Sequence, residues 1–131
     1  MRIEDNFKDT DCYKITCVSL KPDSCKIIKG PEEERRLVEA LLDDYHISRY
    51  EKMIQLVVRE MIEESYQKEF FHIFSLQHLQ EEFQNGKKKV AYSYRRKIEG
   101  QVRSVTTELY PSRQGEHGEL EEFMMYVFIE K

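Results

Sequence analysis

Hydrophobic and polar positions follow two different periods along this chain. Apolar and polar side chains alternate within residues 12–20, and they alternate again within residues 90–110 and 120–129. A period of two is typical of β-strands, because successive side chains point to opposite faces of a sheet. Residues 31–85 instead repeat their apolar side chains every three or four positions, as amphipathic helices do. The pattern therefore predicts strands in both end regions and helices between them.

The first alternating stretch predicts a β-hairpin. In CYKITCVSL, the side chains of Tyr13, Ile15 and Cys17 fall on one face of the expected strand. Pro22 and Asp23 suit the centre of a type I turn. The segment CKIIKG is the expected return strand.

Four helices are expected in the middle region. Their boundary signals are Pro31 at the start of the first, Ser48 as the N-cap of the second, the apolar run YQKEFFHIF for the third, and Ser75 with Asn85-Gly86 at the two ends of the fourth. Glu32–Glu34 lie in the first turn of the first helix, where carboxylates interact favourably with the helix dipole. We expect this acidic run, and Glu63-Glu64 further on, to form solvent-exposed faces.

The period returns to two after Gly86. The next strand is expected to place Val90, Tyr92, Tyr94 and Arg96 on one face and Ala91, Ser93, Arg95 and Lys97 on the other. Glu99-Gly100 forms the expected turn, because glycine readily takes a positive φ. The return strand is expected to end at Pro111. The last segment, LEEFMMYVFIE, is apolar on both faces, which indicates a central strand or one covered on each side.

Strands at both ends with helices between them indicate an α+β fold. The simplest assembly is one antiparallel sheet of about five strands, with short helices covering one face. The elements then follow in the order β-β-α-α-α-α-β-β-β. The two end regions must meet in the middle of that sheet.

The last third of the chain has a distinctive sequence. FSLQHLQEEFQNGKKKVAYSYRRKIEGQVRSVTTELYP places a short helix and a glycine break before a hairpin with Tyr-Arg-Arg in one strand and Glu-Gly at its turn. GELEEFMMYVFIEK follows as the final strand. These segments resemble the second half of PAS-like domains in clostridial histidine kinases and diguanylate cyclases. The resemblance runs from about Tyr13 to Lys131, although Ile62-Glu63-Glu64-Ser65 stands where related chains have a His-Pro-Asp-Asp type turn.

The resemblance implies a PAS-like fold and a cytoplasmic, non-catalytic sensory module. Such a module binds a small molecule or relays a signal to a fused output domain, a histidine kinase or a diguanylate cyclase. Residues 1–131 would form a single sensory domain excised from a longer multidomain protein, with self-association or docking to the output domain. The chain has no haem-ligating histidine pattern, flavin-cysteine motif or chromophore-attachment motif, so no cofactor is assigned. The alternative is a ligand-free protein–protein interaction or dimerisation module with a filled core.

Composition and charge narrow the class further. A chain of 131 residues is long enough for one domain with its own core. The formal net charge of −4 argues against a nucleic-acid partner, because phosphate binding needs a basic face. No apolar run reaches the roughly 18–20 residues of a membrane-spanning helix, so we expect no membrane insertion by this segment.

No catalytic or metal site is expected. The chain contains no GxSxG, HExxH or P-loop motif. Its three cysteines, Cys12, Cys17 and Cys25, match no common zinc spacing, and its four histidines are scattered.

A ligand pocket in a PAS-like fold would lie between the sheet and the helices. The candidate lining residues are Ile15, Cys17, Phe71, Tyr92, Tyr94, Met125 and Val127. The hydroxyls of Tyr92 and Tyr94 are the best polar candidates, because a buried hydroxyl needs a partner. The alternative is that these side chains are ordinary core. Alternation leaves open which sheet face turns inward, since a shift of one residue inverts the set.

A second candidate surface is basic. Arg95, Lys97 and Arg103 follow Lys87–Lys89 in the densest positive patch of the chain. Cross-strand pairing with carboxylates such as Glu99 and Glu108 is the commoner fate of such a patch. The alternatives are docking on an acidic surface of a second copy or of the output domain, and nucleic-acid binding, against which the net charge argues. Arg96 shares the tyrosine face near the turn and is expected to reach water at the rim of the sheet.

Overall fold

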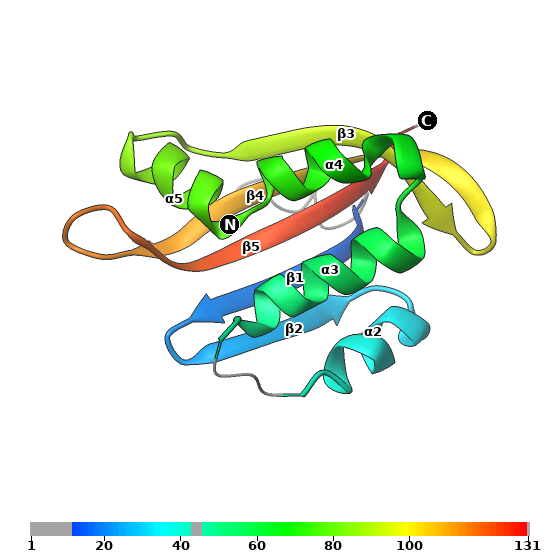
Figure 1. Ribbon diagram of the computed structural model, residues 1–131, viewed down its shortest axis with the longest axis horizontal. Helices are drawn as coiled ribbons and strands as arrows, with labels where there is room; N and C mark the ends of the chain where they lie inside the picture. The colour runs from blue at the N-terminus through cyan, green and yellow to red at the C-terminus, as the bar shows by residue number, and fades with distance from the viewer. Residues whose placement is uncertain (1–11, 43–45, 131) are drawn as a thin grey trace.

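The computed structural model describes residues 12–42 and 46–130. In these ranges the chain forms one five-stranded antiparallel sheet with four helices on one of its faces (Figure 1). The strands are β1 (Cys12–Leu20), β2 (Asp23–Lys29), β3 (Val90–Ile98), β4 (Gln101–Gln114) and β5 (Leu120–Ile129). The helices are α2 (Glu32–Glu39), α3 (Arg49–Met61), α4 (Glu64–Ile73) and α5 (Leu76–Gln84).

The sheet has the strand order β2-β1-β5-β4-β3, and every neighbouring pair is antiparallel. The two end regions of the chain therefore meet at β5, which lies between β1 and β4 (Figure 1). This confirms the α+β, PAS-like expectation. The strand β5 is therefore a central strand, which is one of the two possibilities that its apolar faces indicated.

The register decides which side of the sheet faces the helices. Thr16 pairs with Met125 and Val18 pairs with Phe123, and these side chains are buried on the helix side. Ile15 and Cys17 pair with Tyr126 and Met124, so they point to the opposite face.

A β-bulge separates Tyr13 from that alternation. Cys12 pairs with Phe128 and Lys14 pairs with Val127, so Tyr13 is the extra residue. Its ring lies 5.5 Å from the guanidinium carbon of Arg96. The expectation that Tyr13, Ile15 and Cys17 share one face is therefore wrong for Tyr13, because a bulge re-aims one side chain and leaves no mark in a pattern of period two.

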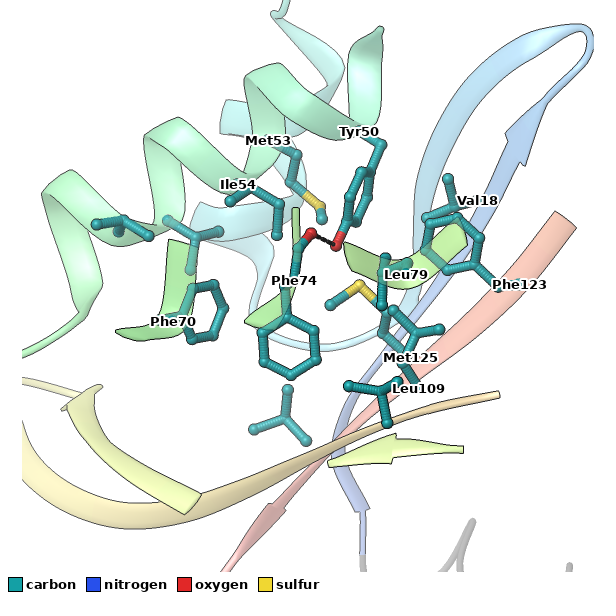
Figure 2. Close-up of a cluster of buried hydrophobic side chains, with 14 of the residues drawn as sticks. Val18, Tyr50, Met53, Ile54, Phe70, Phe74, Leu79, Leu109, Phe123 and Met125 are labelled. Atoms are coloured by element: carbon teal, nitrogen blue, oxygen red, sulfur yellow. Dashed lines mark hydrogen bonds between the residues drawn. The ribbon is translucent and has the colours of Figure 1, made fainter. Parts of the chain in front are cut away.

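Aromatic side chains join the helix layer to the sheet. The Tyr50 ring on α3 meets the Phe123 ring on β5 edge to face, with centroids 4.9 Å apart. The Tyr50 hydroxyl donates to the carbonyl of Phe74 at 2.7 Å, as Figure 2 shows. Phe70 and Phe74 pack against each other with their ring centroids 4.7 Å apart. Each aromatic ring thus buries apolar surface between the layers, and the buried Tyr50 hydroxyl has a hydrogen-bond acceptor.

The helix boundaries follow most of the predicted signals. Pro31 precedes α2, and Ser48 caps α3 through a complete capping box with Glu51. Ser75 caps α5 by accepting from the backbone N–H of His78. The acidic run at the start of α2 is not uniformly exposed, since Glu34 is buried and only 5% accessible. That part of the expectation is wrong, because Glu34 has cationic partners on the sheet.

The turns and ends of the strands differ from the expectation in two places. The first turn consists of Lys21 and Pro22, joined by a cis peptide bond, and Leu20 pairs with Asp23. It is therefore not a type I turn centred on Pro22-Asp23. The strand β4 continues past Pro111 to Gln114, because register shifts beside Pro111 accommodate a residue that has no N–H. The Glu99-Gly100 turn is confirmed, with φ of 51° and 80°.

Replacing the cap of α3 tests the local stability of the helix layer. Ser48→Ala removes the hydroxyl that accepts from the Glu51 N–H at 3.1 Å. We expect it to lower the free energy of unfolding by about 1 kcal/mol in urea titrations. Ser112→Ala is the matched control, since Ser112 is exposed on β4. A change in Ser48→Ala no larger than in the control would contradict the assigned cap.

Candidate functional site

A charged cluster lies in the interior between the sheet and α2. The Glu34 Oε1 atom accepts from the Lys14 ammonium at 2.9 Å, and its Oε2 atom accepts from Arg96 Nη2 at 2.5 Å. The relative exposures of Lys14, Glu34 and Arg96 are 4%, 5% and 1%. We call these three residues the ionic cluster. It ties α2 to β1 and β3, which are distant in the sequence.

Local structure holds each member of the ionic cluster in place. Lys14 follows the bulge of β1, and Glu34 is in the first turn of α2. Arg96 is pinned on β3: its Nε donates to the Lys97 carbonyl at 3.1 Å, and its backbone pairs with Ile62 beyond the end of α3. The expectation that Arg96 reaches water is wrong, because the α3–α4 connection and the ionic cluster cover this end of β3.

The ionic cluster contains two cations and one carboxylate. Burial by itself raises the pKa of Glu34, but the charges and hydrogen bonds of Lys14 and Arg96 outweigh it and hold that pKa below its ordinary value. Burial lowers the pKa of Lys14; Glu34 opposes this shift and Arg96 adds to it. Arg96 Nη1 is buried and has no hydrogen-bond partner among the described residues. The ionic cluster therefore has more cationic groups than carboxylates.

Several spaces border the ionic cluster, and the smallest, of about 10 Å³, is lined by Lys14 and Glu34 with apolar side chains of α2 and α3. An inner cavity of about 20 Å³ lies between the sheet and α3 and α4; its lining includes Lys14, Arg96, Tyr94, Thr107, Thr16, Met125 and Val127. An outer cleft of about 370 Å³ is bordered by α2, the end of α3 and the β3–β4 turn; its lining includes Tyr13, Glu33, Glu34, Leu37, Glu60, Met61, Lys97 and Glu99. Glu34 is among the lining residues of the cleft, and Lys14 and Arg96 are among those of the inner cavity, so the ionic cluster lies between the two spaces.

The structure brings together three of the seven predicted pocket residues. Tyr94, Met125 and Val127 line the inner cavity. The Tyr94 hydroxyl forms a hydrogen bond of 2.8 Å with the Thr107 hydroxyl. These positions agree with the predicted location between sheet and helices, and their ligand-binding role stays a prediction.

The other four predicted pocket residues lie away from the inner cavity. Ile15 and Cys17 are on the opposite sheet face, because the inward face of β1 carries Lys14 and Thr16 instead. The Tyr92 hydroxyl is exposed and donates to Glu69 at 3.3 Å. Phe71 is 41% exposed and borders a separate surface pocket between α3 and α4; that pocket also includes Tyr50, Ile54, Phe74 and Leu76.

Sequence reasoning missed the polar members of the site. Lys14, Thr16 and Thr107 are buried on the helix side of the sheet. A polar face of a strand ordinarily indicates solvent, so the candidate lining residues were drawn from the Ile15 and Cys17 face, although alternation left open which face turns inward. One signal could have found them. A buried Lys on the inner face of a strand requires a carboxylate on the element that covers it, and the acidic start of α2 supplies one.

The predicted docking residues are exposed but do not share one face. Arg95 and Lys97 point away from the helix side, and Arg95 pairs with Glu63 at 3.3 Å. Arg103 pairs across the hairpin with Arg96, so it belongs to the other face of the sheet. Docking through Arg95, Lys97 and Arg103 stays a prediction, and any single partner must reach around the hairpin to contact all three.

Metal sites and membrane-spanning helices were both looked for among residues 12–42 and 46–130. No group of three or more His, Cys, Asp or Glu side chains within them is arranged to hold a metal ion. None of their helices is long and apolar enough to cross a membrane.

The chain was compared with known proteins. No protein-family model matches it, and no curated protein matches it. One similar solved structure is the N-terminal domain of a diguanylate cyclase with a PAS/PAC sensor from Marinobacter aquaeolei. The two share 13% identity with a TM-score of 0.49, and the likeness covers 88% of this chain and 93% of that one. The fold assignment given above depends on the strand order and not on this likeness.

Removing the carboxylate of the ionic cluster gives a direct test of its energetics. Glu34→Gln leaves two buried cations without a counter-charge, and we expect it to cost about 3–5 kcal/mol of unfolding free energy at pH 7. Because the folded pKa of Glu34 is lowered, the unfolded chain binds more protons in the acid range. The stabilisation is therefore fully present above Glu34's ordinary value of 4.5, and it is lost as the pH falls through the lowered pKa.

Urea titrations of wild type and Glu34→Gln across this pH range measure the effect. The difference between them should shrink as the pH falls. Glu32→Gln is the matched control, because Glu32 is the exposed carboxylate at the start of the same helix. A cost below about 1 kcal/mol, or a cost that does not change with pH, would contradict the assigned pairing.

Proposed function

We propose that this chain is a non-catalytic sensory and signal-transduction module that controls a fused output domain, a histidine kinase or a diguanylate cyclase. The observation that carries the proposal is the ionic cluster of Lys14, Glu34 and Arg96. Buried ion pairs of this kind are often no more stabilising than apolar residues of similar volume. Their presence in a domain of this size is therefore better explained by a role in switching than by stability.

The ionic cluster supplies a two-state element. With Glu34 in place, both cations have a partner and α2 is held on the sheet. A signal that draws Glu34 away leaves two unpaired cations inside, so β1 and β3 must adjust at the same time. The strand β5 hydrogen-bonds to β1 and β4, and β4 bonds to β3. A shift in either strand therefore reaches β5, the last element before the output domain in this proposal.

The outer cleft is the place where a small molecule would act on this element. Its volume of about 370 Å³ falls within the size of small-molecule sites, roughly 300–1,000 Å³. Glu34 is one of its lining residues, together with Leu37 and Met61, which are apolar. A ligand bound there contacts α2, α3 and the β3–β4 turn at once, and so it favours one arrangement of these elements over another.

A ligand-free interaction or dimerisation module is the second candidate. The observation that favours it is the small inner cavity, since about 20 Å³ leaves the space between sheet and helices essentially filled. In that case a partner surface, rather than a small molecule, would displace Glu34 or α2. The two candidates share the ionic cluster and differ in what acts on it.

A fusion protein tests the signalling role. The chain is joined through Lys131 to a diguanylate cyclase domain without a sensor of its own, and the rate of cyclic-dinucleotide synthesis is measured. We expect Glu34→Gln to change the basal rate by about 5-fold or more, the lower end of typical allosteric coupling. Glu32→Gln should leave the rate unchanged, because Glu32 is exposed and outside the ionic cluster.

The rates are compared at a temperature at which near-ultraviolet circular dichroism shows every variant folded. An equal rate in wild type and Glu34→Gln would contradict the proposal. A rate that follows only the dimer fraction, measured by sedimentation, would favour the interaction module instead.

A further inference from the structure

The residues that line the outer cleft combine carboxylates with apolar side chains. The charged lining residues are Glu33, Glu34, Glu60, Glu99 and Lys97, and the others include Tyr13, Pro31, Leu37 and Met61. Glu34 is already paired within the ionic cluster. The other three carboxylates are set against the ammonium group of Lys97, so these four residues carry a formal charge of −2. The cleft therefore offers negative charge beside an apolar surface.

Three different elements supply these carboxylates. Glu33 lies in the first turn of α2, Glu60 at the end of α3, and Glu99 in the β3–β4 turn. All three residues are exposed. Glu60 pairs with its neighbour Arg59 at 3.0 Å, but neither Glu33 nor Glu99 has an ion-pair partner within residues 12–42 and 46–130. Two carboxylates from different elements are thus available to a cation that enters the cleft.

Tyr13 lies where these charges act together. Burial raises the pKa of the Tyr13 hydroxyl. The charges of Glu34, Glu99 and Glu33 raise this pKa further, and the guanidinium of the ionic cluster lowers it. Because the interaction between two charges weakens with distance, these carboxylates lie near the Tyr13 hydroxyl. A cation bound beside Tyr13 therefore interacts favourably with carboxylates of α2 and of the β3–β4 turn at once.

The size, charge and apolar lining of the cleft select among ligands. A volume of about 370 Å³ accommodates a small organic molecule. The net negative charge of the lining repels an anion, and an uncharged molecule forms no charge-assisted hydrogen bond with the carboxylates. Exposed ion pairs contribute little one at a time, so a ligand with two ammonium groups gains more than a ligand with one. A methylene chain between these groups buries apolar surface against Leu37 and Met61.

We propose that the outer cleft binds an aliphatic diamine, whose ammonium groups pair with the carboxylates of Glu33 and Glu99 and whose methylene chain lies against the apolar lining. The inference rests on the proposed function, since the same cleft is there the ligand site of the sensory module. The bound diamine lies beside Tyr13, whose ring is 5.5 Å from the guanidinium carbon of Arg96. Its charge thereby acts on the ionic cluster.

Titration of the full chain followed by nuclear magnetic resonance of the backbone amides tests the ligand class at constant ionic strength. The three probes have chains of the same length: cadaverine with two ammonium groups, pentylamine with one, and glutarate with two carboxylates. We expect saturable shifts around Glu33 and Gly100 with cadaverine, affinity lower by about 2- to 5-fold for pentylamine, and no saturable shift with glutarate. Absence of saturable shifts at these amides with cadaverine, or equal affinity for cadaverine and pentylamine, would overturn the proposal.

Charge variants of the cleft separate this site from a general effect of net charge. Glu33→Gln and Glu99→Gln should each weaken cadaverine binding by about 2- to 5-fold, and Lys97→Met should strengthen it, because a like charge is removed. Glu32→Gln is the matched control, since Glu32 is exposed in the same helix turn and does not line the cleft; it should keep the affinity. An equal loss in Glu32→Gln and Glu33→Gln would overturn the proposal.

The cyclase fusion distinguishes failure of this inference from failure of the proposed function. A basal rate that changes in Glu34→Gln, in a fusion that does not bind cadaverine, would overturn the diamine site and leave the sensory function standing. Cadaverine binding at the cleft, with a rate that neither cadaverine nor Glu34→Gln alters, would support the diamine site and contradict the sensory function.

Discussion

The Glu34 carboxylate links the helix layer to the sheet at the ionic cluster. Glu34 accepts from Lys14 on β1 and from Arg96 on β3, and it is the first-turn residue of the helix that follows the first hairpin. Removing three charged groups from water is expensive, and the cost is recovered only while all three remain in contact. Glu34 therefore helps to hold α2 on the sheet, and it holds the guanidinium of Arg96 that packs on the Tyr13 ring.

For the sensory function proposed above, the same arrangement offers a way in which a filled domain responds to a signal. The core between sheet and helices is closed by aromatic packing around Tyr50, Phe74 and Phe123 (Figure 2), and the inner cavity beside it measures only about 20 Å³. The ionic cluster lies beside that core and borders the open cleft through Glu34. Polar contacts of this kind separate more readily than apolar packing when a competing partner offers the same charges. In the proposed function the response therefore belongs to the ionic cluster, while the apolar part of the core keeps the fold constant.

Local signals in the sequence predicted the order of the elements, the caps at Ser48 and Ser75, and the Glu99-Gly100 turn, because each depends on a few neighbouring residues. The site was predicted only in part. Tyr94, Met125 and Val127 were placed correctly between sheet and helices, but Ile15 and Cys17 were not.

The missing part of the site depends on long-range pairing. The Glu34–Arg96 contact joins residues 62 positions apart, and the bulge at Tyr13 changes the face of a side chain without changing the pattern around it. Native-state hydrogen exchange tests the central claim most directly. In Glu34→Gln, the amides of α2, of β1 around Lys14 and of β3 around Arg96 should lose protection together and by the same free energy, since one contact couples them. Loss of protection confined to α2, with β1 and β3 exchanging as in wild type, would contradict the account.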